Sequence, residues 1–166
     1  MKQEKKHTLT SGWHVSSVLV IAQIVFSFFL SNDASLQVLE YVGWAILVIG
    51  LAVGYMGASA VRRKGEVPKG KSSVHTTFLA GSGIYAVVRH PQYLSWVFIS
   101  LAMILISQHW LVVAIGVAAM VAIYIQARQD DKSFIEKFGD DYKRYMQSVP
   151  GLNFLVGLIR LMERRR

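Results

Sequence analysis

Residues 83–93 carry the sequence GIYAVVRHPQY, in which a cationic pair flanked by two tyrosines stands at the start of a long uncharged run. Arg89 and His90 supply hydrogen-bond donors for an anionic or carbonyl group, and histidine also changes its charge near neutral pH. Pro91 suits the first turn of a helix, where its missing N–H has no partner in any case. A plain membrane anchor has no use for such a segment, so residues 83–93 mark a functional site at the start of a helix.

The rest of the chain is strongly apolar. Of its 166 residues, 53% are hydrophobic and only 17% are charged, which is unusual for a water-soluble protein and leaves room for one domain over 1–166. A basic start before an apolar run also fits a secretory signal, but no small-residue cleavage site follows at residues 31–33. We expect an all-α, polytopic membrane helix bundle of about four transmembrane helices, at about 14–30, 36–61, 92–107 and 110–127.

Beyond residue 127 the chain becomes polar, with apolar residues at helical spacing on both sides of Pro150 and Gly151. The second of these stretches ends in the basic sequence ERRR at 163–166. An apolar stripe amid basic residues is typical of a helix at the membrane surface, where arginine is attracted to anionic headgroups. We therefore predict cytoplasmic interfacial helices in the C-terminal part.

The basic residues indicate an orientation. All 18 Lys and Arg fall in three segments, with three in 1–13, six in 62–89 and nine in 128–166. Four spans place these segments on one side, and an excess of Lys and Arg marks the cytoplasmic side. We thus predict an integral, multi-pass membrane protein with both the N- and the C-terminus cytoplasmic. The same distribution explains the net charge of +8 by contact of the basic residues with membrane lipids. It gives no reason to expect nucleic acid as a partner.

The sequence also bears on metal binding and on contacts between helices. The chain has no cysteine and its five histidines are scattered, so we expect no metal. Gly43, Gly50, Gly54 and Gly57 share one face of the second run, where another helix can approach closely. Packing inside the chain is the first interpretation, while a ligand groove, or an oligomer contact through Gly43, Gly50 and Gly54, stays open.

Two carboxylates complement the cationic pair. Asp130 and Asp131 follow the fourth run, and a helical hairpin returns that end of the chain to the level of Arg89 and His90. Charge pairing at the membrane boundary would explain the arrangement. So would a site for a zwitterion, with carboxylates for an ammonium group and Arg89 or His90 for a carboxylate, as in an amino acid joined to a nucleoside.

Together these residues resemble the integral-membrane methyltransferases, namely the isoprenylcysteine carboxyl methyltransferase and phospholipid N-methyltransferase group. The resemblance covers about residues 78–151, the predicted cofactor-binding region, while residues 1–77 are similar only in forming two membrane spans. It lies in a set of motif residues at matching positions: Gly83, Tyr85, Arg89, His90, Pro91, Tyr93, Asp130, Asp131, Phe138, Gly139, Tyr142, Tyr145, Val149 and Pro150.

The resemblance implies S-adenosylmethionine as cofactor and methyl transfer to a lipophilic small-molecule or lipid acceptor, an isoprenylcysteine-like carboxylate or a phospholipid amine, at the cytoplasmic face of a membrane. Its implied catalytic residues are Arg89, His90 and Asp130. The family usually has two glutamates at positions 130 and 131, so the shorter aspartates depart from its pattern. The implied cofactor-binding residues are Gly83, Tyr85, His90, Pro91, Tyr93, Asp130 and Asp131.

The acceptor decides how much chemistry the protein must supply. An ionised carboxylate needs mainly orientation, for which Arg89 is suited, whereas an amine or thiol must lose a proton to a base such as His90 or an aspartate. His90 as a simple hydrogen-bonding residue also stays open. So do two other functions: a sterol-reductase-like NADPH enzyme, although such proteins tend to have Asn in place of Pro91, and a non-enzymatic membrane lipid-binding protein.

Overall fold

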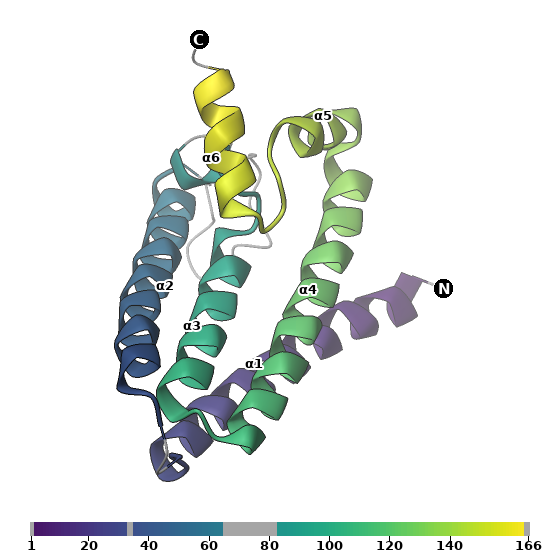
Figure 1. The fold of residues 1–166 in the computed structure, drawn as a ribbon. Coiled ribbons are helices and arrows are strands. Elements are labelled where there is room, and N and C mark those ends of the chain that lie inside the picture. The colour runs from purple at the N-terminus through teal and green to yellow at the C-terminus, as the bar shows by residue number, and fades with distance from the viewer. Residues whose placement is uncertain (1, 33–34, 65–82, 165–166) are drawn as a thin grey trace. The chain divides into compact units, whose positions relative to one another are not determined.

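The computed structural model describes the backbone of residues 2–32, 35–64 and 83–164, with side chains for 15–32, 35–63 and 83–164. These parts are helical and contain no strand, which confirms the predicted all-α class (Figure 1). The helices are α1 (Lys2–Phe29), α2 (Gln37–Lys64), the 3-10 helix η2 (Gly83–Ala86), α3 (Pro91–Ser107), α4 (Trp110–Phe138), α5 (Asp140–Ser148) and α6 (Phe154–Glu163).

The chain divides into two compact units. Unit 1 comprises Met1–Leu51 and Ser95–Asp130, and unit 2 comprises Ala52–Leu94 and Asp131–Arg166. The border falls within α2, α3 and α4, so each of these helices contributes to both units.

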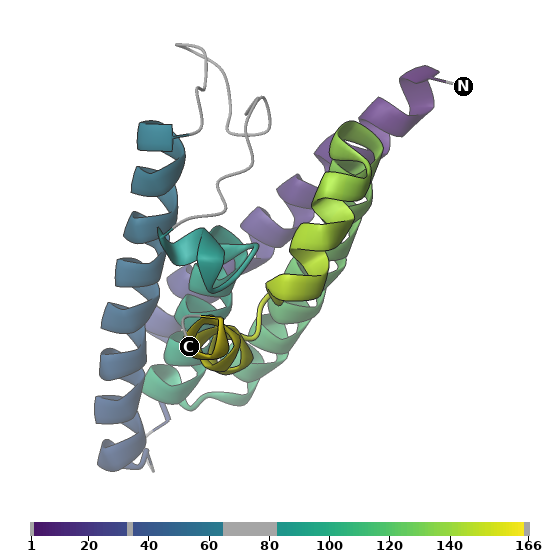
Figure 2. The same ribbon diagram turned by 90° about the horizontal axis from the view of Figure 1, so that it is seen from above.

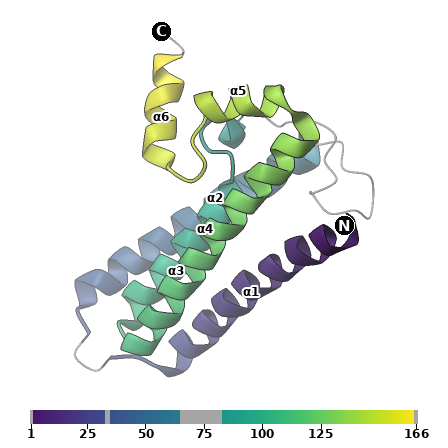
Figure 3. The same ribbon diagram turned by 90° about the vertical axis from the view of Figure 1, so that its right-hand side faces the viewer.

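The core of unit 1 is built from α1, α2, α3 and α4. The antiparallel helices α3 and α4 lie side by side and are joined by the predicted short turn at 108–109 (Figure 3). Ala102, Met103 and Val112 are buried between them. Apolar residues of α1, α2 and α3, together with Leu30 just after α1, pack against this cluster: Ile24, Leu30, Ile46, Leu47 and Ile106.

Unit 1 also buries polar groups. The Gln23 side chain of α1 is completely buried, and its Nε2 donates to the carbonyl oxygen of Ser100 at 2.9 Å. The hydroxyl of Ser100 donates back to Gln23 Oε1. Large apolar residues such as Ile21 and Val121 are exposed instead. Polar groups that bond between helices, combined with an apolar exterior, are what a lipid environment favours.

Among the residues that the structure describes, two helices are long and apolar enough to cross a membrane, Gln37–Arg63 and Trp110–Phe138. Val15–Phe29 and Pro91–Ser107 are apolar but shorter. The structure therefore supplies two of the expected spans by length and composition, and the number of four stays a prediction.

Helix α4 is longer than the apolar run that predicted it. It continues past Ala127 to Phe138, because neither Pro nor Gly interrupts the chain before Gly139. Gly139 has a φ of 61°, a conformation that glycine adopts readily, and its N–H bonds to Ile135 O at 2.9 Å. Helix α5 then starts with Asp140 and Asp141, whose charges suit a helix N-terminus. The amphipathic stretch after residue 127 thus forms two helices.

The glycines of α2 pack against α3 inside unit 1. A Cβ atom at Gly43 would lie 2.8 Å from Ile106 Cγ1, and one at Gly50 would lie 2.9 Å from Phe98 Cβ. Both positions therefore use the absence of a side chain for a contact within the chain. An oligomer contact through the Gly43, Gly50 and Gly54 face stays a prediction.

Unit 2 contains the ends of α2 and α4, the first turn of α3, and η2, α5 and α6 (Figure 2). Helix α6 packs on the chain that follows η2, because a Cβ atom at Gly157 would lie only 2.0 Å from the carbonyl oxygen of Val87. Arg164 Nη2 donates to Ala86 O at 3.0 Å. The predicted C-terminal helix is thus present and contacts the cationic segment.

Candidate active site

The backbone of Arg89 and His90 is held by the loop between α5 and α6. Gly83 enters η2 with a φ of 64°, and the cationic pair follows between η2 and α3. The N–H of Arg89 donates to Pro150 O at 3.0 Å, and that of His90 donates to Gly151 O at 3.2 Å. Pro150 and Gly151, each 61 positions further along the chain, therefore fix the backbone that carries these two side chains.

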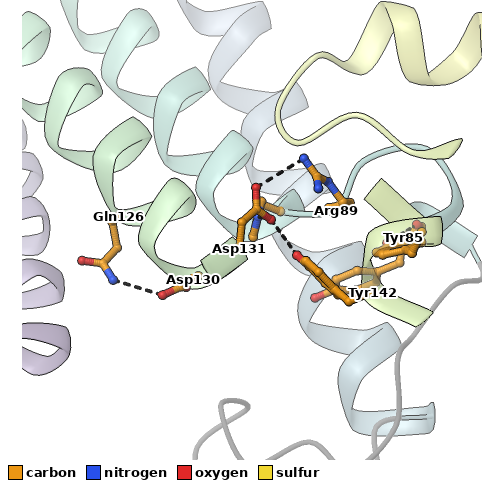
Figure 4. A network of polar contacts seen from close by, with 8 residues as sticks. Tyr85, Arg89, Gln126, Asp130, Asp131 and Tyr142 are labelled. Atoms are coloured by element: carbon orange, nitrogen blue, oxygen red, sulfur yellow. Dashed lines mark hydrogen bonds and ion pairs between the residues drawn. The ribbon is translucent and has the colours of Figure 1, made fainter. Parts of the chain in front are cut away.

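Asp131 bridges the two cationic side chains. Its Oδ2 lies 3.3 Å from Arg89 Nη2, and its Oδ1 lies 2.8 Å from His90 Nε2 (Figure 4). The side chains of all three are buried, with 7%, 5% and 6% exposed for Arg89, His90 and Asp131. A buried carboxylate is stable in this setting because it is paired and hydrogen-bonded.

Tyr142 of α5 completes the shell of Asp131. Its hydroxyl donates to Oδ1, the oxygen that also faces His90, at 2.6 Å (Figure 4). An ionised carboxylate only accepts hydrogen bonds, so the Nε2 atom of His90 must carry a hydrogen in this arrangement. The contact at Nε2 therefore fixes the orientation of the His90 ring. The other ring nitrogen, Nδ1, is left for chemistry or binding.

Three tyrosines surround the cluster as neutral groups. Burial raises the pKa of Tyr85 to about 12. Burial, and then the bond to Asp131, raises the pKa of Tyr142, while burial and the neighbouring Tyr85 raise that of Tyr145. The hydroxyl of Tyr145 donates to the carbonyl oxygen of Tyr85 at 2.5 Å. These side chains therefore serve as hydrogen-bond donors near neutral pH and do not act as bases.

The guanidinium of Arg89 retains unused donors. Nε and Nη1 are buried and have no hydrogen-bond partner within the described residues. A buried donor without a partner is unfavourable, so the N–H groups of Nε and Nη1, which point to different edges of the guanidinium, are each able to bind an acceptor atom of an anion. Gly151 lets the backbone approach this group closely, because a Cβ atom there would lie 3.2 Å from Nη2. The site can therefore accept an anion.

The two aspartates bond to different partners. Asp130, which belongs to unit 1, accepts a hydrogen bond from Gln126 Nε2 at 3.1 Å, one helical turn away (Figure 4). Gln126 is buried, and its Oε1 has no hydrogen-bond partner among the residues the structure describes. The structure thus joins Arg89 and His90 to Asp131, and it gives Asp130 a hydrogen bond from Gln126.

The remaining predicted residues line the start of α3. Pro91 is fully buried and packs against Gly57, where a Cβ atom would lie 3.1 Å from Pro91 Cγ. The rings of His90 and Tyr93 have centroids 5.7 Å apart. Residues 78–82, the first part of the predicted cofactor-binding region, lie outside the described residues.

The roles of Tyr142, Pro150 and Gly151 did not follow from sequence reasoning. Both tyrosines of α5 belong to the motif, but Tyr142 follows Asp131 across the break at Gly139, so helical periodicity does not relate them. The bonds from Arg89 and His90 to the two carbonyls are backbone contacts, which leave no mark in side-chain identity. Proximity of Tyr142 to Asp131 within the motif was the one available signal.

Comparison with known proteins gives a consistent result. Residues 71–136 match the isoprenylcysteine carboxyl methyltransferase (ICMT) family. The chain is 32% identical over 90 residues to a protein-S-isoprenylcysteine O-methyltransferase of Xenopus laevis, and 34% identical over 94 residues to the one of Homo sapiens. Each alignment covers 53% of this chain and 31% of the relative. No solved structure gives a significant match to the chain.

The chain therefore spans about a third of the length of these curated relatives. The matched segment contains Arg89, His90, Asp130 and Asp131, whereas the motif residues from 138 to 150 lie beyond it. That resemblance is confirmed: over residues 71–136 the chain is similar to the ICMT family of membrane methyltransferases.

Proposed function

We propose that this chain transfers a methyl group from S-adenosylmethionine to the carboxylate of a lipophilic, isoprenylcysteine-like acceptor at the cytoplasmic face of a membrane. The observation that carries the proposal is the buried guanidinium of Arg89, whose Nε and Nη1 have no hydrogen-bond partner among the described residues while Nη2 faces Asp131. Asp131 thus holds this guanidinium through Nη2, while the donors at Nε and Nη1 can bind an anion.

A carboxylate acceptor suits the chemistry of the buried side chains. An amine or a thiol would have to lose a proton, and among the described side chains beside Arg89 only Nδ1 of His90 is left as a base. Asp131 accepts hydrogen bonds from His90 and Tyr142, and the raised pKa of Tyr142 keeps its hydroxyl neutral. A carboxylate is ionised near neutral pH and gives up no proton when it is methylated, so orientation by Arg89 is sufficient.

The residues present also fit the cofactor. S-adenosylmethionine, when bound, supplies a methyl group on a sulfonium, and the methyl–sulfur bond breaks with both electrons staying on sulfur as the acceptor oxygen bonds to carbon. The predicted cofactor-binding residues stay assigned to it, with Gly83, Tyr85, His90, Pro91 and Tyr93 around the start of α3. Asp130 and Asp131 are the acidic residues among them. Burial of the cluster keeps water from competing for the methyl group.

The membrane placement follows the charge pattern. Four spans with both termini cytoplasmic place the start of α3 on the cytoplasmic side, where Arg89 and His90 lie. Two helices have the length and composition of spans, which supports the multi-pass arrangement. A lipophilic acceptor then reaches the site from the bilayer.

The test uses the purified full chain in lipid nanodiscs with radiolabelled S-adenosylmethionine. N-acetyl-S-farnesylcysteine serves as the carboxylate acceptor and phosphatidylethanolamine as the amine acceptor. We expect label on the farnesylcysteine in a form that alkali releases as methanol, because a methyl ester hydrolyses while an N-methyl group does not.

Two other results would redirect the assignment. Alkali-stable label on phosphatidylethanolamine would exclude the carboxylate proposal and favour an amine acceptor. Absence of calorimetric binding of both S-adenosylmethionine and S-adenosylhomocysteine would exclude a methyltransferase, and binding of NADPH in the same assay would favour the reductase alternative.

A further inference from the structure

Helix α6 has two different faces. Its inner face contains Gly157, which lies against Val87 O, together with the half-buried Phe154 and Leu161 at helical spacing. Its outer face consists of four exposed apolar residues at positions i, i+3, i+4 and i+7: Leu155, Leu158, Ile159 and Met162. Leu155 alone has 71% of its surface exposed. A continuous apolar face of this kind marks a surface that contacts an apolar partner.

The basic end of the helix identifies that partner. Arg160 lies in the last turn of α6, Arg164 follows the helix and two further arginines stand at 165 and 166, while Glu163 is the one acidic residue of the helix. Arg160 and Arg164 donate to the carbonyl oxygens of Gln147 and Ala86, and a basic helix end of this kind is attracted to anionic lipid headgroups. An apolar face on a helix with a basic end is typical of a helix that lies in the surface of a bilayer.

The chain connectivity places α6 near such a surface. Unit 2 contains the C-terminal ends of α2 and α4, and these are the two helices with the length and composition of membrane spans. The C-terminal end of a span is where the chain leaves the bilayer. Helix α6 is therefore close to headgroups whichever partner is considered.

The inner face of α6 connects to the candidate active site. Arg164 donates to Ala86 O, Gly157 contacts Val87, and the loop before α6 accepts hydrogen bonds from the N–H groups of Arg89 and His90. Four of the five residues from 86 to 90 thus touch α6 or the loop that leads into it. A displacement of α6 would move the backbone that carries both cationic side chains.

We propose that the outer face of α6 binds the surface of an anionic bilayer, and that this contact holds Arg89 and His90 in their binding arrangement. The lipid contact stands by itself, whereas its coupling to ligand affinity rests on the proposed function. The chain then binds its ligand most tightly when α6 lies on lipid.

The absence of native cysteine gives a direct test of the lipid contact. Ile159→Cys carries a nitroxide label on the outer face, and Lys143→Cys carries the same label on an exposed polar position of α5. The full chain is placed in nanodiscs of phosphatidylcholine, with or without phosphatidylglycerol. We expect the label at 159 to be more accessible to oxygen than to a water-soluble nickel chelate, most clearly with phosphatidylglycerol, and the label at 143 to show the reverse.

Two results would overturn the lipid contact. One is equal access of the nickel chelate to both labels, which would place the outer face in water. The other is strong spin–spin broadening at 159, which would show that a second copy of the chain covers this face.

The coupling is measured as calorimetric affinity for S-adenosylhomocysteine. Ile159→Gln should weaken binding about three- to tenfold in phosphatidylglycerol nanodiscs, because one apolar anchor is lost, while Lys143→Gln should leave affinity unchanged. Unchanged affinity in Ile159→Gln would overturn the coupling. If no variant and no lipid gives binding, the proposed function fails, and the labels still decide whether α6 lies on the membrane.

Discussion

Tyr142 donates its hydroxyl hydrogen to Asp131 Oδ1 at 2.6 Å, although a helix break at Gly139 separates the two residues. The same oxygen lies 2.8 Å from His90 Nε2. Asp131 therefore receives one hydrogen bond from α5 and one from the start of α3, and Tyr142 is a positioning residue for the carboxylate that orients His90.

Tyr142→Phe should loosen this arrangement. The substitution removes one hydrogen bond to a charged, buried group, which contributes about 1.5–3 kcal/mol. We expect a lower Tm and weaker binding of S-adenosylhomocysteine. Tyr145→Phe is the matched control, because Tyr145 donates to the neutral carbonyl of Tyr85 and should contribute less. Equal losses in the two variants would contradict the assigned role of Tyr142.

The two aspartates should respond differently to neutralisation. Asp131→Asn leaves the buried guanidinium of Arg89 without its carboxylate, and breaking a buried ion pair in this way costs about 3–5 kcal/mol. Asp130→Asn affects a residue that is less buried and bonds to Gln126, so a smaller loss of stability is expected. Thermal unfolding in detergent measures both. Cofactor affinity of a folded Asp130→Asn variant then tests the predicted role of Asp130.

Arg89→Lys should separate charge from geometry. Lysine keeps the positive charge beside Asp131 but lacks the fixed, planar donors that arginine has at Nε and Nη1. We expect the KM for N-acetyl-S-farnesylcysteine to rise by about tenfold or more, because a charge-assisted hydrogen bond is lost. The affinity for S-adenosylhomocysteine should change much less. A loss confined to cofactor affinity would assign the free donors to the cofactor.

Alkaline pH should reveal the buried tyrosines. The pKa of Tyr85 is raised from 10 to about 12, so the folded protein keeps its proton in a range where the unfolded chain loses it. The stabilisation is complete below pH 10 and is lost as the pH rises toward about 12. Tyrosinate absorbance should show a late phase that shrinks in Tyr85→Phe. Ionisation of all seven tyrosines together near pH 10 would contradict this.

Gln23→Leu should destabilise unit 1. It leaves the hydroxyl of Ser100 without its partner on α1, at a cost of roughly 1 kcal/mol for a hydrogen bond between membrane helices. Gln126→Leu is the comparison, because that buried amide has an Oε1 atom without a hydrogen-bond partner in the described part of the chain. Thermal unfolding should show the larger loss for Gln23→Leu. The reverse order would mean that the Gln23 contacts contribute little.

Helices could be predicted better than contacts. The apolar runs located α2, α3 and the start of α4, because the length of an apolar run and the helix-breaking residues around it can be read from the local sequence. The end of α4 at Phe138 could not be predicted from the apolar run, since a charged sequence continues a helix until Gly139 allows it to end. The division into two units also depends on packing that no local pattern reports.

The sequence predicted which residues form the candidate site, but only partly which of them pair with one another. The cationic pair and an aspartate lie together as the hairpin suggested, but the resemblance implied a catalytic role for Asp130, whereas the aspartate paired with Arg89 and His90 is Asp131. Their separation depends on helix rotation, which turns successive side chains by about 100° and gives them different neighbours. The anchoring carbonyls of Pro150 and Gly151 were outside the reach of side-chain reasoning.

The buried amide of Gln23 sets an order for biosynthesis. It donates to the backbone carbonyl oxygens of Ser100 on α3 and Val112 on α4, which lie 77 and 89 residues further along the chain. When α1 leaves the ribosome, none of these groups has been made, so the amide must first be satisfied by water, lipid headgroups or the translocation machinery. Helix α1 can therefore form these hydrogen bonds only after the α3–α4 hairpin has been synthesised. A nascent chain that stalls before Ser100 cannot form them.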